Sequence, residues 1–180
     1  MANRGTWQID PAHTTIEFAV KHMMFTTVRG RFKQFSGTIE ADEEHPDRSS
    51  VQVEIDAASI DTGVADRDTH LKSADFLEVE KHAKITFRSK RVEGAAAKEG
   101  DRFRVTGDLT IRGTTMEVTL DATYEGRGKD PWGKERAGAR ATAELDRRQW
   151  GLMWNQALET GGILVGNNVK IEAEVQAVKA

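Results

Sequence analysis

Residues 102–124 decide the fold, and their sequence is RFRVTGDLTIRGTTMEVTLDATY. Apolar or small side chains occupy every second position from 103 to 111, and again from 116 to 124. This period of two predicts two β-strands, each with one face in the core and one face in water. Residues 112–114 (RGT) between them are typical of a tight hairpin turn. The stretch therefore predicts two neighbouring antiparallel strands.

The same alternation recurs along most of the chain. It is clear at 15–22, 51–56, 137–146 and 169–177, and a short first strand is expected around Trp7 and Ile9. Strands with one dry face belong to antiparallel sheets, and closing a large sheet removes its exposed edges. We therefore predict an all-β protein, an antiparallel up-and-down β-barrel of about eight strands. A two-sheet sandwich is the second choice.

Three irregular features accompany the strands. The alternation changes phase between residues 28 and 39, which predicts a bulge near Lys33 and Gln34 that keeps both halves facing inward. A short helix is expected at roughly Ala65 to Ser73, near one barrel end, because acidic residues occupy its first turn. Residues 150–162 predict a second short helix or a capping loop. Polar or glycine-rich loops are expected at 43–49, 94–100 and 126–133.

Length and composition limit the class of protein. The 180 residues carry a net charge of -3 and no cysteine. Disulfides, thiol catalysis and cysteine-ligated zinc are excluded, and no basic excess favours nucleic acid. Nothing approaches the roughly 18 apolar residues of a membrane span. We expect one domain over 1–180 and, because no signal-like stretch is visible, a cytoplasmic location, or a periplasmic one if a leader has been removed.

The inward face of the predicted barrel is rich in small residues. Ala137, Ala139, Ala141 and Ala143 lie on one face of a single strand, and glycines add further small inward positions on other strands. Native interiors do not tolerate large voids without cost. Either bulky neighbours fill this space or a ligand does, and the sequence leaves both options open.

Motifs for catalysis are weak. The chain has no G-x-S-x-G, P-loop or HExxH sequence, and its five histidines lack the spacing of a metal site, so we expect no metal and no cofactor. His22 falls on the dry face, where it would bond a backbone group or the polar end of a ligand. Arg67 and His70, like the pair at 147–148, fit either a solvated surface or a lid that meets a ligand head group.

Ten short motifs run through the chain in order and carry a family resemblance. The chain resembles the YceI-like family of bacterial lipocalin-like, polyisoprenoid-binding proteins. The resemblance implies a barrel with a helix near one end, an apolar channel, and binding of a polyisoprenoid or isoprenoid-quinone amphiphile without catalysis. It further implies a role in stress response, transport or lipid handling. The motifs are 7–13 (WQIDPAH), 18–24 (FAVKHMM), 28–32 (VRGRF), 58–62 (ASIDT), 67–73 (RDTHLKS), 75–76 (DF), 85–87 (ITF), 107–113 (GDLTIRG), 150–152 (WGL) and 164–166 (LVG).

The leading hypothesis is a carrier that binds an amphiphilic isoprenoid lipid. One alternative is a small hydrolase or isomerase that uses His22, His70 and a carboxylate such as Asp68. Another is a solidly packed, stress-related interaction protein, and a homodimer is among the options for assembly. The expected ligand-binding residues comprise an apolar lining and polar head-group contacts: Phe18, Val20, Phe32, Leu109, Ile111, Met116, Val118 and Trp154, with His22, Arg67 and His70.

Overall fold

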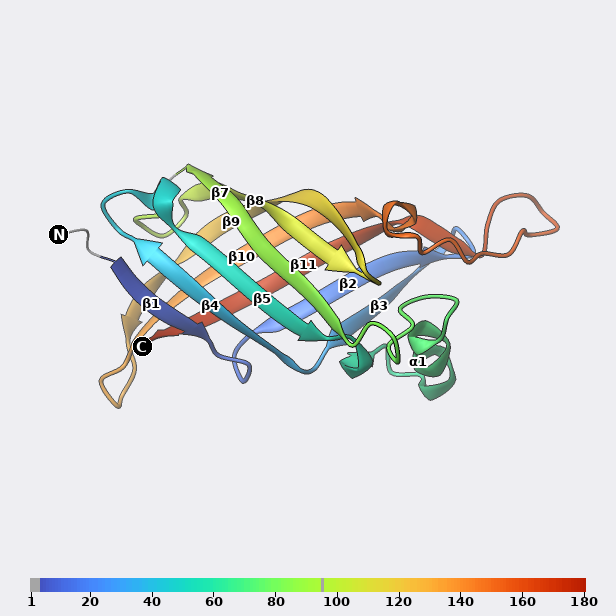
Figure 1. Cartoon of the computed structure of the whole chain (residues 1–180), viewed down its shortest axis with the longest axis horizontal. Coiled ribbons are helices and arrows are strands. Elements are labelled where there is room, and N and C mark those ends of the chain that lie inside the picture. Colours follow the sequence, from blue (N-terminus) through green and yellow to red (C-terminus); the bar gives the residue numbers. More distant parts are fainter. Residues whose placement is uncertain (1–3, 95) are drawn as a thin grey trace.

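The computed structural model describes residues 4–94 and 96–180, which form one barrel with a short helix at one end (Figure 1). The helix α1 spans eight residues, and no described helix has the length and apolar character needed to cross a membrane. Three single 3-10 turns complete the secondary structure. The elements are β1 Arg4–Ile9, β2 Thr15–His22, β3 Thr26–Phe32, β4 Phe35–Asp42, η1 Pro46–Arg48, β5 Ser50–Asp56, η2 Ala57–Ser59, β6 Ile60–Asp61, α1 Ala65–Lys72, β7 Lys84–Gly94, β8 Arg102–Ile111, β9 Thr114–Lys129, β10 Glu135–Asp146, η3 Arg147–Trp150 and β11 Val165–Lys179.

The sheet closes on itself through β11. Its C-terminal end pairs with β1, where Trp7 lies opposite Lys179, and its N-terminal part pairs with β2, where Phe18 lies opposite Ile171. The successive strands β1–β2, β3–β4 and β5–β6 each act as one interrupted strand. Every pairing is antiparallel, so the ring is an eight-strand up-and-down barrel. The predicted fold class is confirmed.

Most predicted irregularities are also present. The strand break falls at Lys33 and Gln34, and Phe32 and Phe35 on either side of it pack on the same core cluster. Ile111 pairs with Thr114 around a two-residue turn. The helix α1 matches the expected position, and the segment after η3 is a capping loop rather than a helix.

The loop predicted at 126–133 is wrong. Strand β9 continues to Lys129 and β10 begins at Glu135, so the turn covers only 130–134. The glycine-rich sequence indicated a loop, but pairing with β10 satisfies its backbone, and Gly126 at φ 115° takes up the register shift there. Of the loop predicted at 94–100, Gly94 still belongs to β7, and residue 95 lies outside the described residues.

The core is packed mainly against one wall of the barrel. Two clusters of buried side chains cover the inner faces of β5, β7, β8 and β9 and reach the segment around α1. Two inward glycines, Gly30 on β3 and Gly107 on β8, leave no empty space beside them. A Cβ on Gly30 would collide with the Phe18 ring, and one on Gly107 with the Arg88 carbonyl. At these glycines, large neighbours rather than a ligand occupy the space.

Replacing Gly107 by alanine should therefore be costly. The Arg88 carbonyl belongs to the paired strand β7 and cannot move aside, so we expect the free energy of unfolding to fall by about 2–3 kcal/mol. The matched control is Gly128→Ala in β9, where no atom lies within 4 Å of the added Cβ. Urea unfolding measures both variants, and equal stability of the two would contradict this packing.

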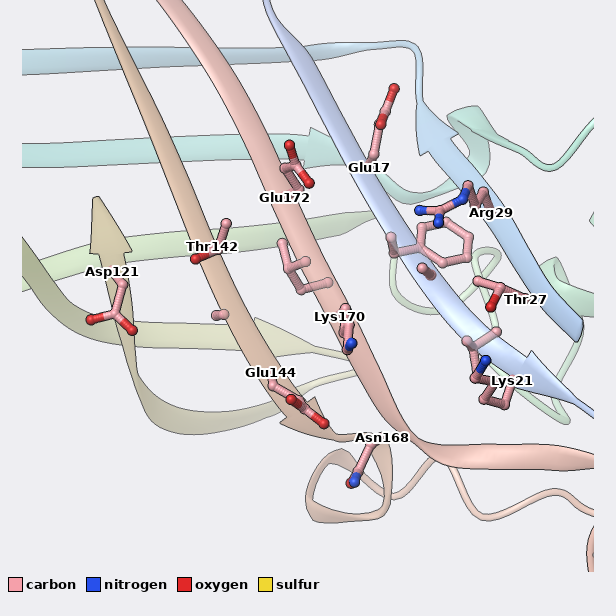
Figure 2. A pocket seen from close by; sticks show the side chains of 15 residues that line it. Glu17, Lys21, Thr27, Arg29, Asp121, Thr142, Glu144, Asn168, Lys170 and Glu172 are labelled. Carbon is pink, nitrogen blue, oxygen red and sulfur yellow. The ribbon is translucent and has the colours of Figure 1, made fainter. Parts of the chain in front are cut away.

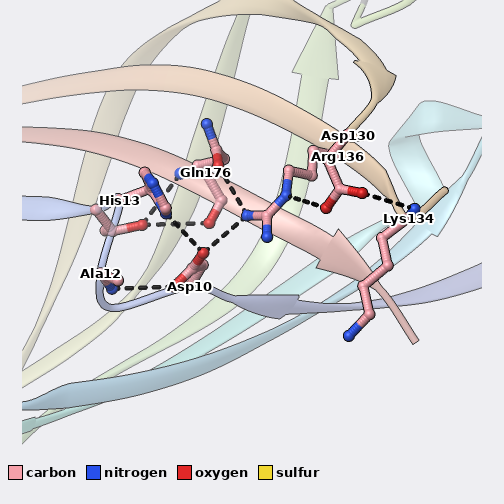
Figure 3. A network of polar contacts seen from close by, with 8 residues as sticks. Asp10, Ala12, His13, Asp130, Lys134, Arg136 and Gln176 are labelled. Carbon is pink, nitrogen blue, oxygen red and sulfur yellow. Dashed lines mark hydrogen bonds and ion pairs between the residues drawn. The ribbon is translucent and has the colours of Figure 1, made fainter. Parts of the chain in front are cut away.

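A polar network ties together the barrel end that holds both termini (Figure 3). The Arg136 guanidinium donates to Asp10 Oδ2 at 2.8 Å, to Asp130 Oδ2 at 2.9 Å and to Gln176 Oε1 at 2.9 Å. His13 Nδ1 lies 2.9 Å from Asp10 Oδ2. The hydrogen bond from Arg136, followed by that from His13, lowers the pKa of Asp10 to about 2. The network pins the break between β1 and β2 to the β9–β10 turn.

The network should make stability depend on acid pH. Because the pKa of Asp10 is lower in the folded chain than its ordinary 3.8, its stabilising contribution is complete above about pH 4 and is lost as the pH falls through 2. Asp10→Asn should lower the melting temperature at pH 7 and flatten its decline between pH 4 and pH 2. Thermal melts between pH 2 and pH 7 test this pH dependence. The control is Asp121→Asn, which removes the exposed ion pair with Arg104. Parallel pH profiles for wild type and Asp10→Asn would refute the assignment.

Candidate functional site

The inner face of β10, β11 and β2 is apolar but not fully buried. Strands β10, β11 and β2 place small and branched apolar side chains inward, while charged side chains such as Arg140 and Glu172 pair on the outside at 2.7 Å. These inner side chains are half-buried. Ala143 and Ile171 pack on one core cluster and Ile16 and Phe18 on the other, so the part of the wall outside both clusters comprises Ala139, Ala141, Ala173 and Val175. The inward cross-strand pairs are Ala139–Val175, Ala141–Ala173, Ala143–Ile171, Ile171–Phe18 and Ala173–Ile16.

The total surface agrees with this arrangement. The protein exposes 10751 Å², whereas a compact protein of 20.0 kDa exposes roughly 8,700 Å². Part of the excess follows from the elongated shape (Figure 1). The apolar inner wall of β10, β11 and β2 is therefore the candidate site, because an apolar ligand lying against it would remove that surface from water.

The predicted lining residues fall into two groups. Phe18 and Val20 on β2 are half-buried, and the Phe18 ring lies 5.8 Å from that of Phe32. On β8 and β9, three predicted residues are half-buried and pack against the core clusters: Leu109, Ile111 and Met116. Val118 is different, since it is only 8% exposed and belongs to the packed cluster.

Trp154, in the capping loop, packs against the helix α1 rather than lying on the inner wall. Its ring centroid is 4.6 Å from that of His70 and 5.5 Å from that of Phe76. His70 Nε2 lies 2.8 Å from Asp75 Oδ2. The structure thus joins Trp154 and His70 in an aromatic cluster at the α1 end. Asp75 was missed by the sequence analysis, although it lies only five residues after His70.

The polar side chains of α1 mainly hold the helix in place. Arg67 Nε donates to Thr62 Oγ1 at 2.8 Å, and its guanidinium also donates to the Thr62 carbonyl at 2.9 Å. Asp68 accepts from the Thr62 backbone N–H at 2.9 Å. Both residues therefore fix the start of the helix.

The three members of the catalytic alternative are not joined. Asp68 is bonded to Thr62, and His70 is bonded to Asp75. His22 lies at the end of β2, paired with Thr26 and Val165. In the described parts of the chain, no hydrogen bond connects any two of His22, His70 and Asp68. His70 thus meets a carboxylate, that of Asp75, but His22 is not joined to this pair.

Arg147 holds the capping loop over the α1 end. It is 5% exposed, and its guanidinium donates to the carbonyls of Leu152 at 2.7 Å, Gly166 at 2.8 Å and Val165 at 3.3 Å. Burial lowers the pKa of Arg147. The neighbouring Trp150 is 1% exposed and donates from Nε1 to the Leu109 carbonyl at 2.9 Å. This end of the barrel is therefore plugged by η3 and the loop that follows it.

A cavity of about 640 Å³ lies elsewhere, along β9, β10, β11, β2 and β3 (Figure 2). Most of its lining side chains belong to the outward positions of these strands and many are charged, among them Glu17, Lys21, Lys170 and Glu172. The alternation of the strands places these charged side chains on the outer face. The lining also includes Phe18, Val20, Ala143 and Ile171 of the inner wall. The charges on its outer side do not suit an apolar chain.

Removing the Arg147 guanidinium should release the capping loop. Arg147→Met leaves three backbone carbonyls without their donor, so we expect the free energy of unfolding to fall by about 3 kcal/mol. Limited proteolysis should then cut within residues 151–164. The control is Arg148→Met, because Arg148 is half-exposed and pairs only with Asp146. If the Arg147 variant resists proteolysis as well as the control does, Arg147 does not hold the capping loop in place.

Comparisons with known proteins agree with the architecture. The family model described as the YceI-like domain matches residues 7–177. A UPF0312 protein of Staphylococcus epidermidis is 38% identical over 171 residues, which cover 94% of this chain and 95% of the relative. BcnA of Burkholderia cenocepacia has a TM-score of 0.80 at 24% identity, covering 93% of this chain and 98% of its own. A polyisoprenoid binding domain from Saccharophagus degradans has a TM-score of 0.72 at 12% identity, covering 97% and 98%. These two structures share the fold.

Proposed function

The chain belongs to the YceI-like family, and we propose that it is a non-catalytic carrier that holds a long-chain amphiphile in its barrel. The ligand we propose is of the polyisoprenoid or isoprenoid-quinone type, handled in lipid transport or stress response. The observation that carries this proposal is the half-buried apolar wall of β10, β11 and β2. Covering such a wall releases roughly 25 cal/mol for each Å² of apolar surface removed from water.

The shape of the wall favours a long, thin ligand. Strand β10 contains 12 residues, so it extends over roughly 40 Å. The small side chains of Ala139, Ala141 and Ala143 follow one another along this length, and each leaves room for a narrow chain. The name of the Saccharophagus degradans domain, which has the same fold, supports a polyisoprenoid as the ligand class.

The other two functions have weaker support. Among the described residues no hydrogen bond joins His22 to the His70–Asp75 pair, which favours binding over catalysis. A solidly packed barrel fits the filled positions at Gly30 and Gly107, but it does not account for the half-buried wall across the barrel. His22, Arg67 and His70 stay our proposed contacts for the ligand head group at the α1 end.

A bulky residue on the inner wall should block the ligand. Ala141→Trp places an indole in the proposed channel, whereas Thr142→Trp, the next residue of β10, places the same group outside. After incubation with a long-chain polyprenol or menaquinone, native mass spectrometry should show the ligand-bound mass for wild type and Thr142→Trp. We expect the bound fraction of Ala141→Trp to fall at least about tenfold.

Circular dichroism melts show whether Ala141→Trp is folded when its uptake is measured. If wild type takes up none of these lipids, or if folded Ala141→Trp binds them as well as wild type does, the carrier function is refuted. Should Ala141→Trp fail to fold, Ala141→Leu provides a smaller obstruction at the same position.

A further inference from the structure

Two segments at one end of the barrel are nearly free of charge. Residues 22–28 (HMMFTTV) contain no acidic or basic residue other than His22, and residues 149–169 (QWGLMWNQALETGGILVGNNV) contain only Glu159. In the whole chain, 31% of residues are charged. The fold brings these two segments together, since Met23 N donates to the Leu164 carbonyl at 2.8 Å and Met24 Sδ packs against Gly162. The two segments, 28 residues with Glu159 as their one carboxylate, therefore lie together on the surface.

Large apolar side chains are exposed at this same end. They belong to the β2–β3 turn, the start of α1 and the loop after η3, which Figure 1 shows at the end of the barrel opposite the termini. Among the described residues, the sixth exposed large apolar side chain, Trp132, lies in the β9–β10 turn at the other end. We call the five the apolar rim: Met23 (41% exposed), Met24 (61%), Phe25 (78%), Val64 (48%) and Met153 (62%).

Turn geometry does not explain the two methionines. Phe25 N donates to the His22 carbonyl at 3.1 Å, and Met23 and Met24 both have positive φ, 50° and 67°. A turn of this type favours Asn-Gly, because side chains with a Cβ are strained there. The β8–β9 turn of the same barrel uses Gly113 at the second position. At the β2–β3 turn the chain instead bears strain at two successive residues and points both side chains toward solvent.

We propose that the apolar rim inserts into the surface of a lipid bilayer. Each rim side chain offers on the order of 100 Å², and the total of roughly 500 Å² is below the roughly 800 Å² per partner of a stable protein interface. The rim also lies on a protruding turn and loop rather than on a flat face (Figure 1). Side chains of this kind bury easily among lipid head groups and the first part of the acyl chains.

Charge behind the rim fits anionic lipid. Lys21 and Arg29 lie on the outer face of β2 and β3, next to the turn (Figure 2). Neither has an ion pair among the described residues, although the carboxylates of Glu17 and Glu172 line the same hollow. Cations just behind an inserted apolar tip are attracted to anionic head groups. The bilayer contact goes beyond the proposed carrier function and rests on separate observations, and together the two would let cargo pass between barrel and membrane.

The test is flotation of the full-length, ligand-free protein with vesicles of phosphatidylcholine containing phosphatidylglycerol. The variant is Met23→Asn with Met24→Gly, which supplies the preferred turn residues and should raise the melting temperature. We expect it to lower the vesicle-bound fraction at least about tenfold. Trp132→Ser, at the other end, is the control and should bind as wild type does. Pure phosphatidylcholine vesicles should bind wild type more weakly.

Two results would overturn the proposal. One is a wild type that does not float with vesicles, or a turn variant that binds them equally. The other is a dimer, seen by sedimentation velocity without vesicles, that the turn variant abolishes, because the rim would then cover a second copy. Polyprenol uptake is measured separately, so a protein that binds vesicles but no polyprenol refutes the carrier function and leaves the bilayer contact intact.

Discussion

The pairing of β11 with both β1 and β2 is the contact on which the rest of the structure depends. A strand with one apolar face has an inside only if its sheet closes, and β11 supplies both halves of that closure. Without it, the edges of β1–β2 and β11 would be exposed to other chains and the inner wall would face solvent. Closure turns a series of hairpins into a barrel with two distinct ends.

The interior that closure creates is filled unequally. On the side of β7 and β8, large residues fill the space that glycines leave, as Phe87 does at Gly107. On the side of β10 and β11, small residues face one another, so Ala141 opposite Ala173 leaves the wall half-buried. The same residue class therefore has opposite consequences in the two halves, and the neighbour across the barrel decides which applies.

Different interactions close the two ends of the barrel. At the termini, Arg136 joins three acceptors and ties a strand break to a turn. At the α1 end, Arg147 is buried without a carboxylate and is satisfied by backbone carbonyls, which holds the charge-poor loop against the barrel. One end is polar and cross-linked, the other apolar and exposed, and this polarity gives the barrel a direction that its strand order alone does not.

The sequence by itself determined the strands, the barrel, the helix at 65–72 and the break at Lys33–Gln34, because alternation and turn residues act locally. It also determined the family, through motifs spread along the chain. Only the tertiary structure decided that Val118 is core, that Trp154 packs against α1, that Asp75 rather than Asp68 meets His70, and that Arg147 is structural. Periodicity assigns a side chain to a face, but what lies opposite that face depends on strands distant in sequence, and only closure brings them together.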